Sequence, residues 1–239
     1  MKILVRGDCT ARRAVALNQD LFGGLPHVVV NCKARTDFFV DHLSIGTPTA
    51  HELDRVLRVA DMKREAGVSP LHQLARTTLE VRDADLLVMC NSADMTYEAW
   101  AERGSGRKLW VDTRYLRDEA AFGREYASLG PLTFAESLEA HVRLIEAYRR
   151  LNGPIPVLYL NQPVIWHPPA QERGAEFRAM GPELAARLPD VYPGDVDDSL
   201  AVPVDMDSIG PGWTRHVDGP TYRRMLLAAV ERGLGRWLP

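Results

Sequence analysis

The sequence predicts an α/β protein, a three-layer sandwich in which helices cover both faces of a mostly parallel sheet of five or six strands. Three observations support this fold class. Short apolar runs alternate with segments in which apolar residues recur at helical spacing. The runs are apolar at nearly every position, as expected for strands buried on both faces. The chain of 239 residues is long enough for such a sandwich to form one core without disulfides.

The strands are predicted from composition and from the residues that end them. The first run, KILVR, is followed by Gly7, the second, HVVVN, ends at Asn31, and the third, DLLVM, is followed by Cys90. Three later runs are shorter or less regular, and with or without the last of them the sheet is expected to contain six or five strands. In chain order, the predicted strands span 2–6, 27–31, 85–89, 108–111, 156–160 and 201–204.

The helices between these strands are predicted from periodicity and from terminal residues. In the first helix, Ala14, Leu17 and Leu21 recur at helical spacing. In the last helix, Pro220 stands in the first turn, where a backbone N–H would have no acceptor within the helix. The proline-rich stretch 162–200 has weak periodicity, so we expect an extended loop there, within a single domain spanning 1–239. The predicted helices span 10–22, 50–66, 71–79, 134–151 and 220–232.

Composition excludes several classes of protein. A net charge of −3 without a lysine- or arginine-rich block gives no footprint for nucleic acid or an anionic membrane. No run approaches 18 apolar residues and no secretion signal follows Met1, so we expect a cytoplasmic protein. Three cysteines without CxxC spacing suit free thiols, and no HxH or HExxH pair suggests a metal site.

Cys32 and Cys90 directly follow predicted strands, and Cys9 follows Gly7-Asp8 after the first strand. Cysteine is a small and often buried hydrophobe, which is a sufficient explanation for Cys32 and Cys90. Cys9 differs, because it stands in a strand-to-helix turn just before a helix. The dipole and free N–H groups of a helix N-terminus stabilise a thiolate, so Cys9 is the candidate reactive thiol.

These residues carry a resemblance to a known superfamily. The strand, the GDC of 7–9 and the following helix resemble the first block of the SGNH/GDSL hydrolases, in which GDS presents the nucleophilic serine. The segment 7–12 (GDCTAR) resembles more specifically the GSCxSR opening of a bacterial SGNH-like family, distantly similar to WcbI-type polysaccharide-biosynthesis proteins. The segment 34–36 (ART) is similar to the ARSS element of that family, and 213–222 resembles its terminal W, FHY and Y pattern.

The resemblance implies an SGNH/flavodoxin-like sandwich and a set of catalytic residues. Cys9 stands in the position of the nucleophilic serine, and His216 stands where the superfamily places the histidine of its DxxH motif. The acid of that motif is absent, because Trp213 occupies its position. Asp205 or Asp207 could orient the imidazole instead, or no acid is used, since a thiolate paired with a histidinium needs less activation than a serine.

The same resemblance suggests residues for the oxyanion and for substrate. The Cys9 backbone N–H and the Asn91 side chain are candidate oxyanion donors, although Asn91 lies in CNSAD and not in the GxND of the superfamily. The alternative for Asn91 is a polar residue that caps a strand end. Asp8, Arg12 and Arg35 are candidate substrate contacts, because arginine can bind a carboxylate or phosphate in bidentate fashion.

The function expected from these residues is acyl transfer through a cysteine nucleophile, in an acyltransferase or an esterase- or thioesterase-like hydrolase. The acyl group would belong to a small metabolite, a sugar or a carrier protein; no cofactor is required, and a CoA or carrier-protein thioester is a candidate donor. One alternative is a non-catalytic protein that binds an anionic ligand such as CoA or a sugar phosphate through Arg12 and Arg35. A third is a redox sensor in which Cys9 pairs with Cys32 or Cys90.

Overall fold

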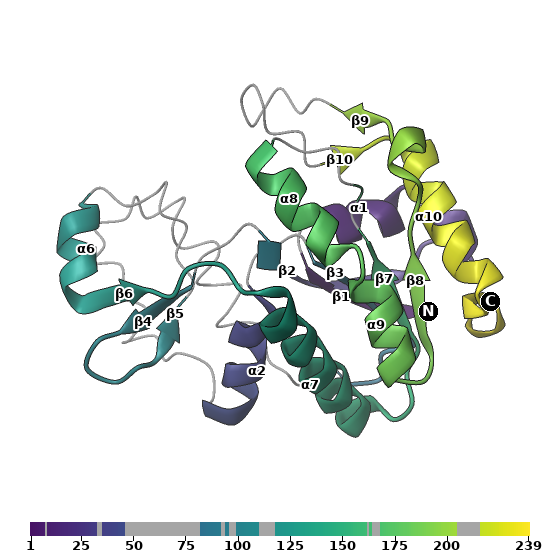
Figure 1. The fold of residues 1–239 in the computed structure, drawn as a ribbon. Coiled ribbons are helices and arrows are strands. Elements are labelled where there is room, and N and C mark those ends of the chain that lie inside the picture. Colours follow the sequence, from purple (N-terminus) through teal and green to yellow (C-terminus); the bar gives the residue numbers. More distant parts are fainter. Residues whose placement is uncertain are drawn as a thin grey trace.

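The computed structural model describes residues 1–7, 9–32, 35–45, 82–91, 94–95, 99–109, 118–161, 163, 168–204 and 216–239, and for Cys9 and His216 it describes the backbone. A five-stranded parallel sheet forms the centre of the molecule (Figure 1), with the strand order β2-β1-β3-β7-β8. Its strands are β1 (Lys2–Gly7), β2 (His27–Cys32), β3 (Leu86–Cys90), β7 (Val157–Leu160) and β8 (Val191–Gly194).

Helices cover both faces of this sheet. One face packs against α2 (Thr36–Ile45), α7 (Phe134–Asn152) and α9 (Met180–Arg187), and the other against α1 (Cys9–Ala16) and α10 (Gly219–Glu231). Successive residues of β1 divide between two apolar cores: Leu4 belongs to the α2/α7 core, while Ile3 and Val5 belong to the α1/α10 core. Because side chains alternate along a strand, a continuous apolar run fills both layers.

Local signals fix the ends of the long helices. At the start of α7 the Thr133 hydroxyl accepts from the Glu136 N–H and the Glu136 carboxylate accepts from the Thr133 N–H, a capping box. At the start of α10 the Asp218 carboxylate accepts from the Thr221 N–H at 2.8 Å. A 3₁₀ helix, η4 (Leu234–Trp237), follows α10.

A small antiparallel sheet projects from the sandwich (Figure 1, left). It contains β4 (Trp100–Glu102), β5 (Lys108–Leu109) and β6 (Tyr126–Ser128), in the order β5-β4-β6, and α6 (Glu119–Glu125) precedes β6. Its aromatic centre is formed by Phe122, which stacks on Tyr126 at 4.5 Å and meets Trp100 edge-on at 5.1 Å between ring centroids. These three residues belong to the same apolar cluster as the α2/α7 face of the main sheet, so the small sheet is an extension of that core.

The predicted fold class is confirmed, but four expected elements differ. The strands expected at 108–111 and 201–204 do not join the main sheet: β5 belongs to the small sheet, and β9 (Pro203–Val204) pairs with β10 (His216–Val217). The stretch 162–200, expected as an extended loop, contains α8 (Pro168–Phe177), α9, β8 and the short helix η3 (Asp198–Leu200). The helix expected at 10–22 ends at Ala16 and is followed by η1 (Gln19–Phe22). The predicted helices 50–66 and 71–79 lie outside the described residues.

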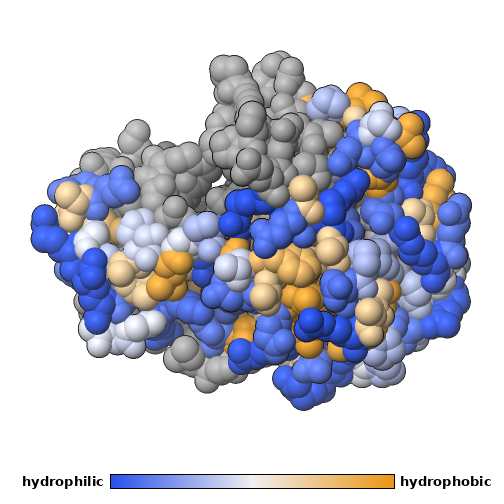
Figure 2. Space-filling model, in the orientation of Figure 1, coloured by the Kyte–Doolittle hydropathy of each residue, from blue (hydrophilic) through white to orange (hydrophobic). Residues whose placement is uncertain are grey.

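Both ends of the chain lie at the amino edge of the sheet, where the strands begin (Figure 1). Met1 and the last three residues, 237–239, line one shallow groove of about 490 Å³ together with Asp85 and Pro156, which directly precede β3 and β7. The face of the molecule in Figure 2 is mostly hydrophilic, with hydrophobic residues in small groups. In the described part of the chain, no helix has both the length and the apolar character needed to cross a bilayer.

Candidate functional site

The strand order identifies one edge of the sheet as the place where a ligand would bind. β1 lies between β2 and β3, so the chain leaves β1 toward one side of the sheet and later returns to its other side. In open parallel sheets the crevice at such a switch point, beyond the carboxyl ends of the strands, is the usual ligand site. Here it lies where β1 ends at Gly7 and β3 ends at Cys90.

Gly7 brings the ends of β1 and β3 into close contact. It has φ of +150°, and a Cβ at this position would stand 2.6 Å from Cys90 Sγ and 3.4 Å from the Cys90 backbone nitrogen. Only glycine therefore fits without displacing β3. On its other side Gly7 is in register with Cys32 of β2. The ends of the three strands are thus adjacent.

The structure places the backbones of Cys9 and His216 at the starts of two neighbouring helices. Cys9 is the first residue of α1, and His216 lies in β10, two residues before Asp218, the N-cap of α10. α1 and α10 contact each other on the same face of the sheet, and both begin at its carboxyl edge (Figure 1). The other catalytic and substrate candidates on these segments, Asp8, Asp205 and Asp207, lie outside the described residues.

Asn91 directly follows β3 and is buried, with 2% of its surface exposed. Its Nδ2 atom donates to the backbone oxygen of Phe177 in α8 at 3.4 Å, while its Oδ1 atom has no hydrogen-bond partner among the described residues. Since a backbone oxygen can only accept, this contact fixes which way the amide faces. The group that Asn91 leaves available is an acceptor, whereas the sequence predicts an oxyanion donor.

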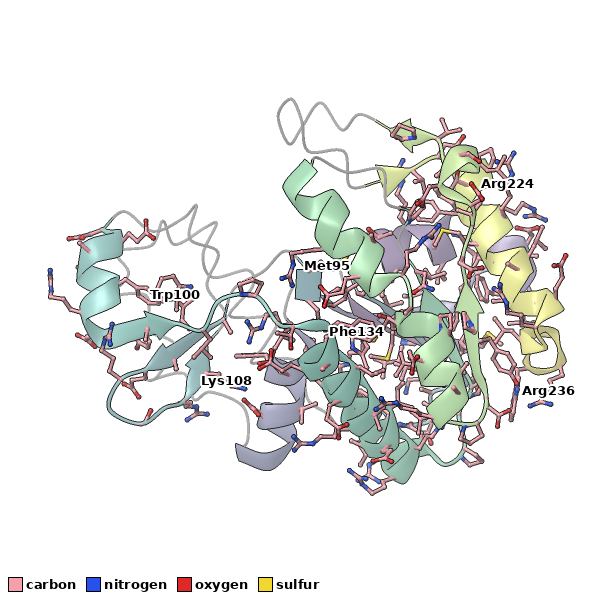
Figure 3. The ribbon with its side chains drawn as sticks, in the orientation of Figure 1. Met95, Trp100, Lys108, Phe134, Arg224 and Arg236 are labelled. Carbon is pink, nitrogen blue, oxygen red and sulfur yellow. The ribbon has the colours of Figure 1, made fainter. Side chains whose placement is uncertain are left out.

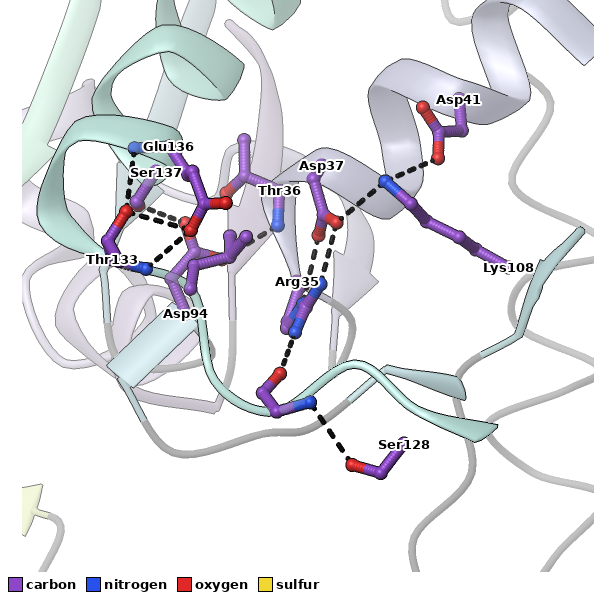
Figure 4. Close-up of polar contacts among 12 residues, drawn as sticks. Arg35, Thr36, Asp37, Asp41, Asp94, Lys108, Ser128, Thr133, Glu136 and Ser137 are labelled. Carbon is purple, nitrogen blue, oxygen red and sulfur yellow. Dashed lines mark hydrogen bonds and ion pairs between the residues drawn. The ribbon is translucent and has the colours of Figure 1, made fainter. Parts of the chain in front are cut away.

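The two candidate substrate arginines have different surroundings. Arg12 is exposed on α1. Arg35 is buried and forms a bidentate ion pair with Asp37, from Nε to Oδ1 at 3.0 Å and from Nη2 to Oδ2 at 2.7 Å, and its Nη1 donates to the Gly130 carbonyl (Figure 4). Its guanidinium therefore already has strong partners within the protein.

Asp37 is the centre of an ion-pair network that joins the small sheet to the sandwich. Lys108 of β5 contacts Asp37 at 3.1 Å and Asp41 at 2.9 Å (Figure 4). Burial favours a raised pKa for Asp37, but the hydrogen bonds and charges of Arg35 and Lys108 outweigh it and hold this pKa below its ordinary value. Lys108 also lines an open groove of about 420 Å³ between α2 and α7.

A second arginine lies beneath the end of β1, on the α2/α7 face. Arg6 is fully buried, and its guanidinium carbon lies 4.8 Å from the ring centroids of both Phe39 and Tyr148. Burial lowers the pKa of Arg6 to about 9. The aromatic faces attract the cation and offset part of its desolvation.

A buried polar cluster beside Asn91 is not among the features predicted from the sequence. It consists of Asp94, Ser137, His141 and the start of α2 at Thr36 (Figure 4 shows all but the histidine). A signal was present, because His141 lies on the buried stripe of α7, three residues after Leu138 and three before Leu144. A titratable side chain on an apolar helix face needs a polar partner from another element.

The cluster has the residue types of a serine hydrolase triad but not its geometry. Ser137 Oγ and Asp94 Oδ2 both approach the same nitrogen, His141 Nδ1, at 3.4 and 3.5 Å. In a triad the serine and the acid contact opposite nitrogens of the imidazole. Ser137 and His141 are fully buried, and Asp94 is 1% exposed, so no substrate reaches them.

The described residues hold no group of three or more histidine, cysteine, aspartate or glutamate side chains arranged to bind a metal ion.

The pKa of Asp94 is raised, mainly because the carboxyl group is buried. The charge of His141 and the hydrogen bonds from Ser137 and the Thr36 N–H lower this pKa, while the nearby charge of Asp37 raises it further. The cluster is therefore a buried acid and imidazole surrounded by hydroxyl groups, next to the candidate site.

Comparisons with known proteins show a likeness in fold. The chain matches no protein-family model and no curated protein sequence. Among solved structures it resembles the lipase Lip_vut3 from a goat rumen metagenome, with a TM-score of 0.51 and 11% sequence identity over 99% of both chains. It also resembles a family two carbohydrate esterase from Clostridium thermocellum, in complex with cellohexaose, with a TM-score of 0.46 and 12% identity over 99% of this chain and 65% of the esterase chain. At these identities the likeness concerns the fold alone.

Proposed function

We propose that this protein transfers acyl groups through a covalent thioester on Cys9, as an acyltransferase or as an esterase- or thioesterase-like hydrolase. The observation that carries the proposal is the position of Cys9, at the first turn of α1 and beside the β1/β3 switch point. A helix N-terminus stabilises a thiolate through its dipole and its free N–H groups. Cys9 is also the residue that stands in the position of the SGNH serine in the resemblance.

The proposed reaction has two steps. The Cys9 thiolate attacks the carbonyl carbon of the acyl donor, a C–S bond forms, and the bond from this carbon to the leaving alcohol or thiol breaks as His216 gives the leaving group a proton. Water or an acceptor hydroxyl then attacks the thioester, His216 takes the proton, and the C–S bond breaks to restore the thiolate. The backbone N–H groups at the start of α1 are the proposed oxyanion donors.

The contacts of Asn91 change its proposed part in this reaction. Because its Nδ2 is bonded to Phe177, Asn91 contributes an acceptor, Oδ1, at the end of β3. An acceptor does not stabilise an oxyanion, and this side chain is buried. We therefore assign the oxyanion to the backbone and give Asn91 the role of holding the end of β3 against α8.

Two features of the substrate remain proposals from the sequence. A CoA or carrier-protein thioester is the proposed acyl donor for a transferase, and a small metabolite or sugar is the proposed acceptor. Of the candidate anion-binding residues, the exposed Arg12 is retained for the donor, whereas Arg35 is assigned to structure because Asp37 and Gly130 occupy its guanidinium. The same contacts weaken the alternative of a binding protein that uses both arginines.

The test combines thiol reactivity with turnover. We expect the iodoacetamide alkylation rate of Cys9 to reach half its maximum well below pH 8.5, about the ordinary pKa of a thiol. Hydrolysis of 4-nitrophenyl acetate and of acetyl-CoA should be lost in Cys9→Ala and kept in the matched cysteine variant Cys32→Ala. His216→Ala should lower kcat and move the midpoint of alkylation to higher pH, because the thiolate loses its cationic partner.

The proposal fails if Cys9→Ala turns over both esters at the wild-type rate. A protein that is stabilised by CoA, without turnover and without an effect of His216→Ala, would support the binding alternative. A disulfide between Cys9 and another cysteine after mild peroxide treatment, detected by mass spectrometry, would support the redox alternative.

A further inference from the structure

The segment 91–95, which carries Asn91 and follows β3, is held by buried polar contacts from three helices. Within the segment, the Met95 N–H donates to the Asn91 carbonyl at 3.2 Å. From outside, α2, α7 and α8 each contribute at least one hydrogen bond to Asn91, Asp94 or Met95. Polar groups that are buried in this way need partners within the protein, and these contacts supply them.

Asp94 makes two of these contacts. Its Oδ1 atom accepts from the Thr36 N–H at 2.7 Å, which gives a partner to a free N–H at the start of α2. Its Oδ2 atom accepts from the Ser137 hydroxyl in the first turn of α7. One carboxylate thus connects the loop after β3 to the starts of two helices that cover the same face of the sheet.

His141 supports this carboxylate in a defined orientation. Its Nδ1 atom lies 2.8 Å from the Ser137 carbonyl oxygen, which can only accept, so Nδ1 carries a proton. That proton also faces Asp94 Oδ2, 3.5 Å away. On the other side of the ring, Nε2 lies 3.3 Å from the Thr36 hydroxyl and 3.5 Å from that of Tyr159.

The last contact comes from α8. Arg173 donates to the Met95 carbonyl at 3.2 Å and to the Leu132 carbonyl at 2.6 Å, just before α7 begins (Figure 3 shows Met95 and Phe134 at this junction). Phe177 of the same helix accepts from Asn91. The segment is therefore fixed at its first, fourth and fifth residues.

We propose that Asp94 and His141 are positioning residues of the candidate active site, which hold Asn91 and the end of β3 in place beside the end of β1 at Gly7. This inference rests on the proposed function, because it gives the pair a part in that reaction. The desolvation of a buried carboxyl group and imidazole is costly. One role that offsets this cost is to select a single conformation of the chain around them. A displacement of about 1 Å in an active-site group can reduce turnover about 100-fold.

The experiment compares Asp94→Asn and His141→Gln with Leu144→Ala, a fully buried α7 residue in the apolar core that makes none of these polar contacts. All three variants are expected to lower the midpoint of thermal unfolding. Only the two polar variants should lower kcat for 4-nitrophenyl acetate, by about 10- to 100-fold, with KM changed less than threefold. Hydrogen exchange of the Met95 and Thr36 amides should be faster in these two variants than in Leu144→Ala.

The outcomes separate this inference from the proposed function. If Cys9→Ala keeps wild-type turnover, the proposed reaction is wrong, and the exchange data alone decide whether Asp94 and His141 hold the segment. If Cys9 is required but both polar variants keep wild-type kcat, or if Leu144→Ala loses as much kcat at equal stability, the pair is structural and the inference is overturned. Unchanged exchange at Met95 and Thr36 overturns it in either case.

Discussion

Replacement of Gly7 by alanine tests the close contact between β1 and β3, on which the geometry of the candidate site depends. Two separate penalties are expected. The φ of +150° lies in a region that is nearly restricted to glycine, and such strain costs about 1 to 3 kcal/mol. The new Cβ would stand 2.6 Å from Cys90 Sγ in a packed core, and overpacking of this kind costs about 1 to 3 kcal/mol more.

Together these penalties predict that Gly7→Ala lowers the free energy of unfolding by about 2 to 6 kcal/mol. For a chain of this size, that corresponds to a fall in Tm of roughly 5 to 20 °C. Two other glycines separate the contributions. Gly24 has φ of +111° with no atom within 4 Å of the place that an added methyl group would take, and Gly104 has neither a positive φ nor a neighbour within 4 Å.

The assay is urea unfolding of the three alanine variants and of the pair Gly7→Ala with Cys90→Ala. Gly24→Ala should show strain alone, about 1 to 3 kcal/mol, and Gly104→Ala should change stability by no more than about 0.5 kcal/mol. Removal of the Cys90 sulfur should restore part of the stability lost in Gly7→Ala, as a favourable coupling in the double-mutant cycle. The reasoning is refuted if Gly7→Ala is as stable as Gly104→Ala, or if the coupling is absent.

Two further predictions concern buried polar groups. Asp37→Asn should lower stability at pH 7 by about 3 to 5 kcal/mol, because it leaves the buried Arg35 cation without its carboxylate, whereas Asp41→Asn, at a half-buried ion pair, should cost no more than about 1 kcal/mol. The pKa of Asp37 is lowered on folding, so its contribution to stability is present above its unfolded pKa and is lost as the pH falls through its folded pKa. In urea titrations, the loss of stability caused by Asp37→Asn should therefore become smaller below about pH 4. A loss that becomes larger there would contradict the assignment. Tyr148→Phe should leave stability unchanged or raise it by up to about 1 kcal/mol, since the buried hydroxyl has no hydrogen-bond partner among the described residues. Tyr159→Phe removes a hydroxyl that contacts His141 and should be destabilising. Equal effects of the two variants on thermal unfolding would contradict this difference.

The part of the fold that the sequence predicts correctly is the part decided by local patterns. The runs KILVR, HVVVN and DLLVM are apolar throughout, and each forms a strand of the main sheet. The periodicity over 134–151 and the proline at position 220 predict helices whose starts agree with the structure within one residue. These signals need no knowledge of which elements pair.

The errors arise where partners far along the chain decide the outcome. Val191–Gly194 contains a proline, which argues against a strand, but β8 lies at the edge of the sheet, where a missing N–H is tolerated. The run at 108–111 resembles a core strand, yet β5 pairs with β4 in the small sheet, whose aromatic centre is formed by Trp100, Phe122 and Tyr126. Sequence patterns do not encode such pairings.

For the candidate site, the sequence predicts positions better than contacts. The end of β1, the start of α1 and the segment before α10 are identified from short motifs, and their backbones share one edge of the sheet. The ion pair of Arg35 with Asp37, two residues away, and the cluster of Asp94 with His141, 47 positions apart in the printed sequence, depend on burial and orientation. Those properties emerge only after the helices pack.

The adjacent chain ends at the amino edge of the sheet have a practical consequence. Met1 and Pro239 line the same groove, on the side of the sheet opposite to the crevice between β1 and β3. A fusion partner or a surface attachment point at either end would therefore leave that crevice accessible to added reagents. A short linker between the two ends would also allow circularly permuted variants, in which new ends open elsewhere while the five strands keep their neighbours.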